Sequence, residues 1–166
     1  DFHFVKKFHK DGNIIDSWGN AGSKNGQFLH AQGITIDSQD NVYVSDAENC
    51  NIQKFDKDGN FITKWGTKGI GPSKFLQPES MAVDSLNNIY VAKDNYVSIF
   101  NGLEKSWENI TFINGQYKNV RDIEVFNDKI YATSDSGLYV SGDKGITWKT
   151  VDFFGRKSQK MARSNR

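Results

Sequence analysis

The sequence has few of the residues that cross-link a fold or span a membrane. Cys50 is the only cysteine among 166 residues, so no internal disulfide can form and the fold must depend on packing. No window approaches the roughly 18 to 20 consecutive apolar residues of a membrane span. Residues 1–3 offer neither an initiator methionine nor the apolar core of a signal peptide, so we expect an excised or processed piece of a longer protein.

An excess of charge of one sign is lacking too. Lysine and arginine together number 21, and aspartate and glutamate 20, which gives a formal net charge of +1. Such a chain has no overall field that would attract nucleic acid or an anionic membrane. We therefore expect neither of these as a partner.

Histidine is equally scarce. The three histidines, His3, His9 and His30, form no pair with the spacing of metal ligands. Arg121 is the only arginine before the C-terminal tail. We therefore expect no metal site, no cofactor and no catalytic set within this chain.

What the sequence does contain is a repeat. Residues 5–44 return at residues 52–91 with a constant offset of 47 and no gap. The sequence Lys-Asp-Gly-Asn at 10–13, for example, returns at 57–60. Further matched pairs are Trp18 and Trp65, Phe28 and Phe75, and Tyr43 and Tyr90.

Each copy of the repeat has the alternation that is typical of strands. The runs 33–37 and 41–45 are short and rich in β-branched and aromatic residues, and helical spacing is absent. Asp-Gly at 11–12 and at 58–59 lies between apolar runs, which favours a tight hairpin with a positive φ at the glycine. Each copy therefore predicts about four antiparallel strands.

These residues resemble the NHL repeat, in which Gly-Ile-x-Val-Asp, Asn-Ile-Tyr-Val and Phe-Asp-x-Asp-Gly segments form one blade. The resemblance covers residues 5–100. It implies an all-β fold, a β-propeller of four-stranded antiparallel blades. Tryptophans and tyrosines that recur at equivalent positions are then expected to pack blade against blade rather than to form a stacking platform.

The C-terminal part of the chain has a different pattern. Trp107 and Trp148 are separated by 41 residues, which predicts one further blade. Here Asp143 is expected to accept backbone N–H bonds, Gly145 to adopt a positive φ, and Trp148 to pack between blades. We assign this segment a structural role. It resembles the Asp-box hairpin of sialidase-like (BNR) propellers through Ser141, Asp143, Gly145, Thr147 and Trp148.

The predicted strands divide residues 1–153 into about three and a half blades. Closed propellers have about four to eight blades, and an open sheet edge promotes association. We therefore expect the ring to be completed by further blades of a larger protein or by another copy in a homo-oligomer. The expected segments are an outer half-blade at 1–19, an NHL blade at 20–66, an NHL-like blade at 67–112, an Asp-box blade at 113–153, and a basic tail or the start of a further segment at 154–166.

The candidate ligand-binding residues lie on loops, where propellers present variable side chains. Turn capping is the alternative for their oxygen atoms, because one loop offers too few ligands for a hard cation. The sequence also departs from the NHL pattern by placing Asn51 where an arginine is typical. The candidates are His30 before an inner strand, Asp46, Glu48 and Asn49 after a second strand, and Lys93 and Asp94 after the next one.

The leading hypothesis for function is a non-catalytic scaffold that presents one face of loops to a protein, peptide or glycan. The alternative is a segment of a lyase or glycoside hydrolase whose active site is completed by other blades, because the resemblance extends to streptogramin lyases. A third hypothesis is an RNA-binding NHL module, which the balance of lysine and aspartate disfavours. The resemblance to Asp-box and microbial NHL proteins also implies an extracytoplasmic location.

Overall fold

The structure is a computed structural model and describes residues 3–93, 96–111 and 119–151. Within these ranges the secondary structure consists of strands and turns, with fourteen strands in all. None of the described residues belongs to a helix that is long and apolar enough to cross a membrane. The prediction of an all-β fold is confirmed.

Three four-stranded antiparallel sheets follow one another along the chain, each in simple sequence order. The first contains β3 (Ala31–Ile36), β4 (Val42–Asp46), β5 (Asn51–Phe55) and β6 (Phe61–Trp65). The second contains β7 (Pro78–Val83), β8 (Ile89–Lys93), β9 (Tyr96–Asn101) and β10 (Ser106–Thr111). The third contains β11 (Val120–Phe126), β12 (Lys129–Ser134), β13 (Gly137–Ser141) and β14 (Lys149–Thr150).

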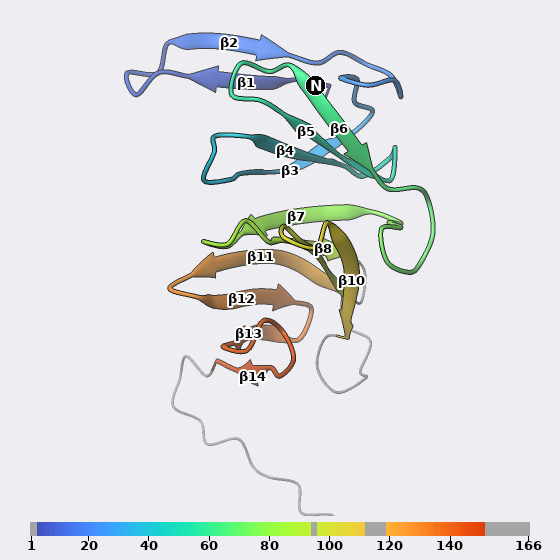
Figure 1. Cartoon of the computed structure of the whole chain (residues 1–166), viewed down its shortest axis with the longest axis vertical. Coiled ribbons are helices and arrows are strands. Elements are labelled where there is room, and N and C mark those ends of the chain that lie inside the picture. Colours follow the sequence, from blue (N-terminus) through green and yellow to red (C-terminus); the bar gives the residue numbers. More distant parts are fainter. Residues whose placement is uncertain (1–2, 94–95, 112–118, 152–166) are drawn as a thin grey trace, which may run out of the picture.

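A two-stranded sheet precedes them, formed by β1 (Val5–Phe8) and β2 (Ile14–Trp18). Val5 pairs with Trp18 in this hairpin, just as Ile52 pairs with Trp65 in the outer half of the first sheet. The hairpin therefore corresponds to the third and fourth strands of a blade. Figure 1 shows it as the first layer of a stack in which the three larger sheets follow.

The first strands of successive sheets lie side by side: β3 lies beside β7, and β7 lies beside β11 (Figure 1). The Ser45 hydroxyl donates to the Glu79 carbonyl at 2.8 Å, and the Ser80 hydroxyl donates to the Asp122 carboxylate at 2.5 Å. These bonds link successive sheets close to their inner strands. The arrangement is that of β-propeller blades, whose inner strands surround the propeller axis.

The core lies between the sheets. One apolar cluster separates the β1–β2 hairpin from the first sheet, a second lies between the first and second sheets, and a third between the second and third. Aromatic rings recur in these layers: Trp18 of the hairpin lies 6.0 Å from Phe55 of the first sheet, and Trp65 of the first sheet lies 5.1 Å from Phe100 of the second. Contact between blades therefore accounts for the recurrence of these rings along the sequence.

Aspartate carboxylates hold the turns at the end of the first two inner strands. Asp37 accepts the backbone N–H of Asn41 at 2.9 Å and the hydroxyl of Tyr43 at 3.0 Å. Asp84 makes the equivalent bonds to Asn88 and Tyr90 at 2.8 and 3.0 Å. The repeated Asp-Ser-x-x-Asn-x-Tyr sequence is thus a turn that ties the first strand of a blade to the second.

Candidate functional site

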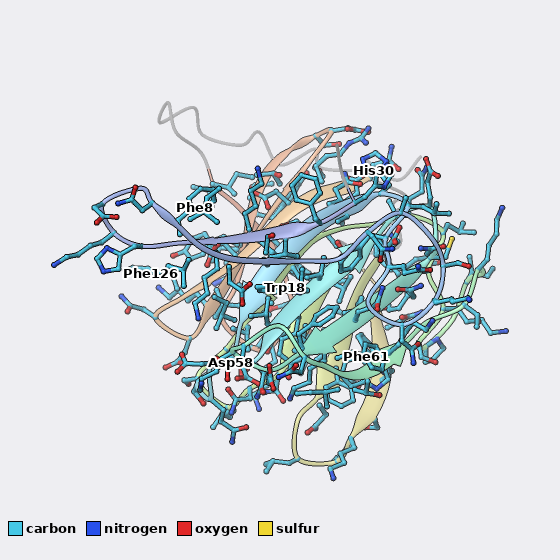
Figure 2. The ribbon with its side chains drawn as sticks, turned by 90° about the horizontal axis from the view of Figure 1, so that it is seen from above. Phe8, Trp18, His30, Asp58, Phe61 and Phe126 are labelled. Carbon is cyan, nitrogen blue, oxygen red and sulfur yellow. The ribbon has the colours of Figure 1, made fainter. Side chains whose placement is uncertain are left out.

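Antiparallel pairing brings the predicted loop residues to one end of the sheets. The start of β3 pairs with the end of β4 through Ala31 and Asp46, and β7 and β8 repeat this through Pro78 and Lys93. We call this end the inner mouth: the starts of β3, β7 and β11, the end of β8, and the loops that follow β4 and β12. In Figure 2, His30 lies toward this end, and Asp58 and Phe126 lie toward the other.

Asp46 is fully buried, and its carboxylate is used within the protein. It accepts the backbone N–H groups of Leu29 at 2.9 Å, His30 at 3.0 Å and Asn49 at 3.1 Å. The Asn49 side chain donates to the same carboxylate at 2.6 Å and also to the Gly22 carbonyl at 2.9 Å. Asp46 and Asn49 therefore close the loop that leads into their own blade, which is the turn-capping alternative.

Lys93 is buried as well, and its ammonium group is also used within the protein. It donates to the backbone carbonyl of Gly71 at 3.0 Å and to that of Lys74 at 2.6 Å, and it lies 5.0 Å from the centre of the Phe75 ring. The two hydrogen bonds and the cation–π contact compensate for the removal of the ammonium group from water. Lys93 thus fastens the loop before β7 to the end of β8.

The remaining loop candidates differ in their surroundings. Glu48 is exposed beside the inner mouth, and His30 is half-buried there. Asp94 lies outside the described residues. The ligand-binding role of these residues stays a prediction.

An exposed polar group that the sequence patterns did not indicate lies at the inner mouth. Arg121 donates through Nε to Asp135 at 3.1 Å and through a terminal nitrogen to Glu79 at 3.4 Å, and Asn119 donates to Asp135 at 2.9 Å. The hydrogen bond with Asp135 raises the pKa of Arg121, and the same bond lowers the pKa of Asp135. Both side chains are about half exposed, so they remain accessible to a ligand.

Arg121 and Glu79 border a hollow of about 300 Å³ that crosses three sheets. Its lining holds the carboxylates of Glu79 and Asp122 and the guanidinium of Arg121, and Arg121 also binds a further carboxylate, that of Asp135. The walls of the hollow come from all three inner strands, namely Gln32 and Gly33 of β3, Glu79 and Ser80 of β7, and Arg121 and Asp122 of β11. We call this group the mouth cluster.

Close approach of the inner strands assembles the mouth cluster. A Cβ atom on Gly33 would lie only 2.2 Å from the Glu79 carbonyl oxygen, so a glycine is needed for β3 to lie this close to β7. Ser80 is the counterpart of Gly33 in the next repeat, and its hydroxyl contacts Asp122 of β11. The members are scattered along the chain and form no motif, so the sequence offered only the isolated Arg121 as a signal.

The Asp143 hairpin lies at the other end of the third sheet, because Ser141 pairs with Ile130 whereas Gly137 pairs with Ser134. Asp143 accepts the Thr147 backbone N–H at 2.8 Å and its hydroxyl at 2.5 Å.

Further bonds make this hairpin a self-contained turn. Ser141 donates to Asp143 and accepts the Gly145 N–H, both at 2.8 Å, and Gly145 has a φ of 87°. Hydrogen bonds from Thr147 and Ser141 lower the pKa of Asp143 to about 2. Trp148 packs half-buried against the cluster between the second and third sheets. The hairpin therefore uses its polar groups on itself.

Within the described ranges, no group of three or more histidine, cysteine or acidic side chains is placed to hold a metal ion. His3, just before β1, contacts the Phe28 carbonyl at 3.1 Å. His9, just after β1 and so at the other end of the hairpin, contacts Asp11 at 3.1 Å. The described histidines thus do not converge.

Comparisons with known proteins agree with this fold. A family model described as a 6-bladed β-propeller matches residues 35–105. No curated protein sequence matches the chain.

Solved structures resemble the chain at low sequence identity. Virginiamycin B lyase from Staphylococcus aureus has a TM-score of 0.67 at 14% identity, covering 90% of this chain and 49% of the lyase. A protein of unknown function from Bacteroides caccae has a TM-score of 0.61 at 13% identity, covering 86% and 56%. The extracellular domain of a putative one-component system from Bacteroides thetaiotaomicron has a TM-score of 0.61 at 17% identity, covering 84% of this chain and 18% of that one. The chain, which spans about half the length of the lyase, is thus a stretch of β-propeller.

Proposed function

We propose that this chain contributes blades to a non-catalytic β-propeller that binds a ligand at the inner mouth. The observation that supports this most is the mouth cluster: exposed polar side chains from three successive inner strands border one hollow. Side chains at this place can change without disturbing the apolar layers between sheets. Binding groups on a rigid scaffold commonly occupy such positions.

The charge of the cluster favours a ligand with basic groups. Glu79, Asp122 and Asp135 offer acceptors around the single guanidinium of Arg121. Carboxylates form their strongest hydrogen bonds with ammonium and guanidinium groups. We therefore propose a segment of a partner protein that carries lysine or arginine, with Arg121 orienting Glu79 and Asp135 for it.

The buried polar groups of the loops serve the fold, so the proposal depends on the exposed side chains of the mouth cluster. Asp46 and Lys93 are both bound to backbone groups of their own blades, so neither is available as an acid, base or ligand. The lyase alternative would require chemistry from residues other than these. The virginiamycin B lyase structure resembles this chain in fold alone.

Binding of a peptide array that includes lysine-rich and arginine-rich sequences tests the proposal, with a glycan array in parallel. The double variant Asp122→Asn, Asp135→Asn should weaken the binding of captured basic peptides about tenfold. This is the loss expected when an interface contact worth about 1.4 kcal/mol is removed. Lys129→Ala, an exposed cation at the opposite end of β12, is the matched control and should leave binding unchanged.

Two outcomes would contradict the proposal. One is that the double variant and the control change the affinity for captured peptides equally. The other is turnover of a streptogramin or a glycoside by the purified protein, which would favour the lyase or hydrolase alternative.

A further inference from the structure

A second hollow lies between the first and second sheets, at the end opposite the inner mouth. It has a volume of about 450 Å³ and is bordered by the turns at residues 37–41, 84–88 and 101–105, which join β3 to β4, β7 to β8 and β9 to β10. Both sheets have four strands, so the walls of this hollow come from described parts of this chain. We call it the turn groove.

Three aromatic rings line the turn groove. Tyr43 stacks on Trp65 with 6.2 Å between the ring centres, and Trp65 lies 5.1 Å from Phe100 of the second sheet. All three rings belong to the apolar cluster between the two sheets or pack against it. The aromatic surface of the groove is therefore held in place by the core.

Hydrogen bonds also fix the turns around the groove relative to one another. The Ser38 N–H donates to the Asn87 side chain at 3.1 Å, which joins the turns of the two sheets. The Gly102 N–H donates to the Asn88 side chain at 3.2 Å, so the third turn is tied to the second. A groove that is formed in the free protein has a lower cost of ordering when a ligand binds.

The second of these turns carries a leucine where the repeat has a polar residue. Leu86 is the counterpart of Gln39, and the backbone N–H of each donates to the aspartate two residues earlier at 2.9 Å. The turn therefore forms with either side chain. Leu86 lines the groove and is 55% exposed, so neither the turn nor the core accounts for an apolar side chain there.

The turn between β9 and β10 shows the same replacement. Leu103 stands at the position of Asp58, since each comes three residues after a phenylalanine that pairs with the second strand of its sheet. The N–H of each donates to the side chain two residues earlier, at 3.0 and 2.9 Å respectively. Leu103 is 84% exposed and, with the half-exposed Ile62 of β6, places apolar side chains from both sheets around the groove.

The charge around the turn groove is positive. Lys54 and Lys105 line it together with one carboxylate, that of Asp37. This carboxylate already accepts the Tyr43 hydroxyl at 3.0 Å and N–H groups of its own turn. Lys105 is exposed, and none of the ion pairs among the described residues includes it. Glu104 beside it does not line the groove.

We propose that the turn groove binds a small molecule that carries an aliphatic or aromatic group and a carboxylate. The apolar group packs between Leu86, Leu103 and Ile62, and the carboxylate accepts a hydrogen bond from Lys105. Small-molecule sites commonly have volumes of about 300 to 1,000 Å³ and apolar walls with a few polar groups that fix the orientation of the ligand. This groove is separate from the mouth cluster and does not depend on the ligand proposed there.

Three probes with the same apolar group and different charges test the proposal: 4-phenylbutyrate, 4-phenylbutanol and 4-phenylbutylamine. Each is titrated into the purified chain with ¹³C-labelled isoleucine and leucine methyl groups. We expect shifts at Ile62, Leu86 and Leu103 and none at Ile70, which is exposed outside the groove. The carboxylate should bind at least about tenfold more tightly than the amine, because the groove has a surplus of cations.

Two sets of variants separate the apolar contact from the charge. Leu86→Gln combined with Leu103→Asn gives both turns side chains like those of the first sheet, and should weaken 4-phenylbutyrate and 4-phenylbutanol about tenfold with little change in thermal unfolding. Lys105→Gln should weaken 4-phenylbutyrate about three- to tenfold and leave 4-phenylbutanol unchanged. Lys10→Gln is the matched control, because Lys10 is exposed in the turn of the β1–β2 hairpin.

Several results would overturn the proposal. They are no methyl shift with 4-phenylbutyrate, equal affinities for the carboxylate and the amine, or equal effects of Lys105→Gln and Lys10→Gln. A large loss of thermal stability in the leucine double variant would assign Leu86 and Leu103 to packing. Self-association without a probe, measured by light scattering and abolished by the double variant, would assign the groove to a contact between two copies.

Discussion

Asp46 and Lys93 occupy the same position in successive sheets and carry opposite charges, yet each binds the backbone of the loop that leads into its own blade. Asp46 accepts N–H groups, including that of Leu29 at 2.9 Å, whereas Lys93 donates to carbonyl groups, including that of Lys74 at 2.6 Å. At this position an acidic side chain accepts bonds from backbone N–H groups, and a basic side chain donates bonds to backbone carbonyl groups.

A neighbouring strand compensates for this exchange. Gln27 is the counterpart of Lys74, and its carbonyl accepts a bond from the Gln53 side chain of β5 at 2.7 Å. In the second sheet Ser98 stands at the position of Gln53, because it pairs with Val91 as Gln53 pairs with Val44. The Ser98 hydroxyl donates to Asn109, and Lys93 of β8 binds the carbonyl of Lys74 instead. The two blades therefore hold similar loops with donors from different strands.

Replacing Asp46 by alanine should lower the free energy of unfolding by about 3 kcal/mol, because three backbone N–H groups lose their buried acceptor. Urea denaturation measures the change. Asp58→Ala is the control: Asp58 is exposed beside Lys57, and surface ion pairs contribute about 0 to 1 kcal/mol. A similar loss in both variants would contradict the assigned role of Asp46.

Tyr43→Phe should destabilise the protein by about 1 to 2 kcal/mol, since the hydroxyl donates to the buried Asp37. Tyr90→Phe should behave alike through Asp84. Tyr131→Phe serves as the control, because Phe126 stands where the third sheet would need the aspartate: Val125 pairs with Ile130 as Ile36 pairs with Val42. Denaturation that ranks Tyr131→Phe with the other two would refute the assignment.

These tyrosines also set an alkaline limit. Burial raises the pKa of Tyr43 and of Tyr90, and the neighbouring aspartate raises each further. A raised pKa means that the stability they contribute is present below about pH 10 and is lost as the pH rises beyond it. Unfolding midpoints measured from pH 8 to pH 11 should fall more gradually in the Tyr43→Phe, Tyr90→Phe double variant than in the wild type.

Asp143 sets a limit at the acid end. Hydrogen bonds from Thr147 and Ser141 lower its pKa to about 2, so its contribution is present above about pH 4 and is lost as the pH falls toward 2. Carboxyl ¹³C shifts should give a midpoint near pH 2 for this residue. Thr147→Val removes a donor and should move that midpoint upward; a midpoint near the ordinary value in the wild type would contradict the network.

Gly33→Ala should destabilise the protein by about 1 to 3 kcal/mol, because its Cβ would meet the Glu79 carbonyl and push β3 away from β7. Gly142→Ala is a matched control with open space around the added methyl group. Thermal unfolding compares the two variants. Equal effects would mean that the close approach of the strands is unimportant.

Much of the fold was predictable because its signals are local. The alternation in runs such as 33–37, and Asp-Gly at 11–12 and 58–59, indicated strands and hairpins, and Gly12 and Gly59 have φ values of 90° and 79°. The offset of 47 then related β1 and β2 to the outer strands of the first sheet. The candidate site was less predictable, since Asp46 and a surface ligand have the same appearance in a sequence.

The sequence by itself determined the order of the strands, the turns that join them and the four-stranded unit, because alternation and turn chemistry act between residues that are near in the chain. Only the tertiary structure decided which polar side chains satisfy backbone groups and which remain exposed. Arg121 meets Glu79 because the inner strands of two sheets lie side by side, and Ile34 is exposed because no described strand covers it. Both outcomes depend on neighbours from other sheets, which no pattern within one repeat specifies.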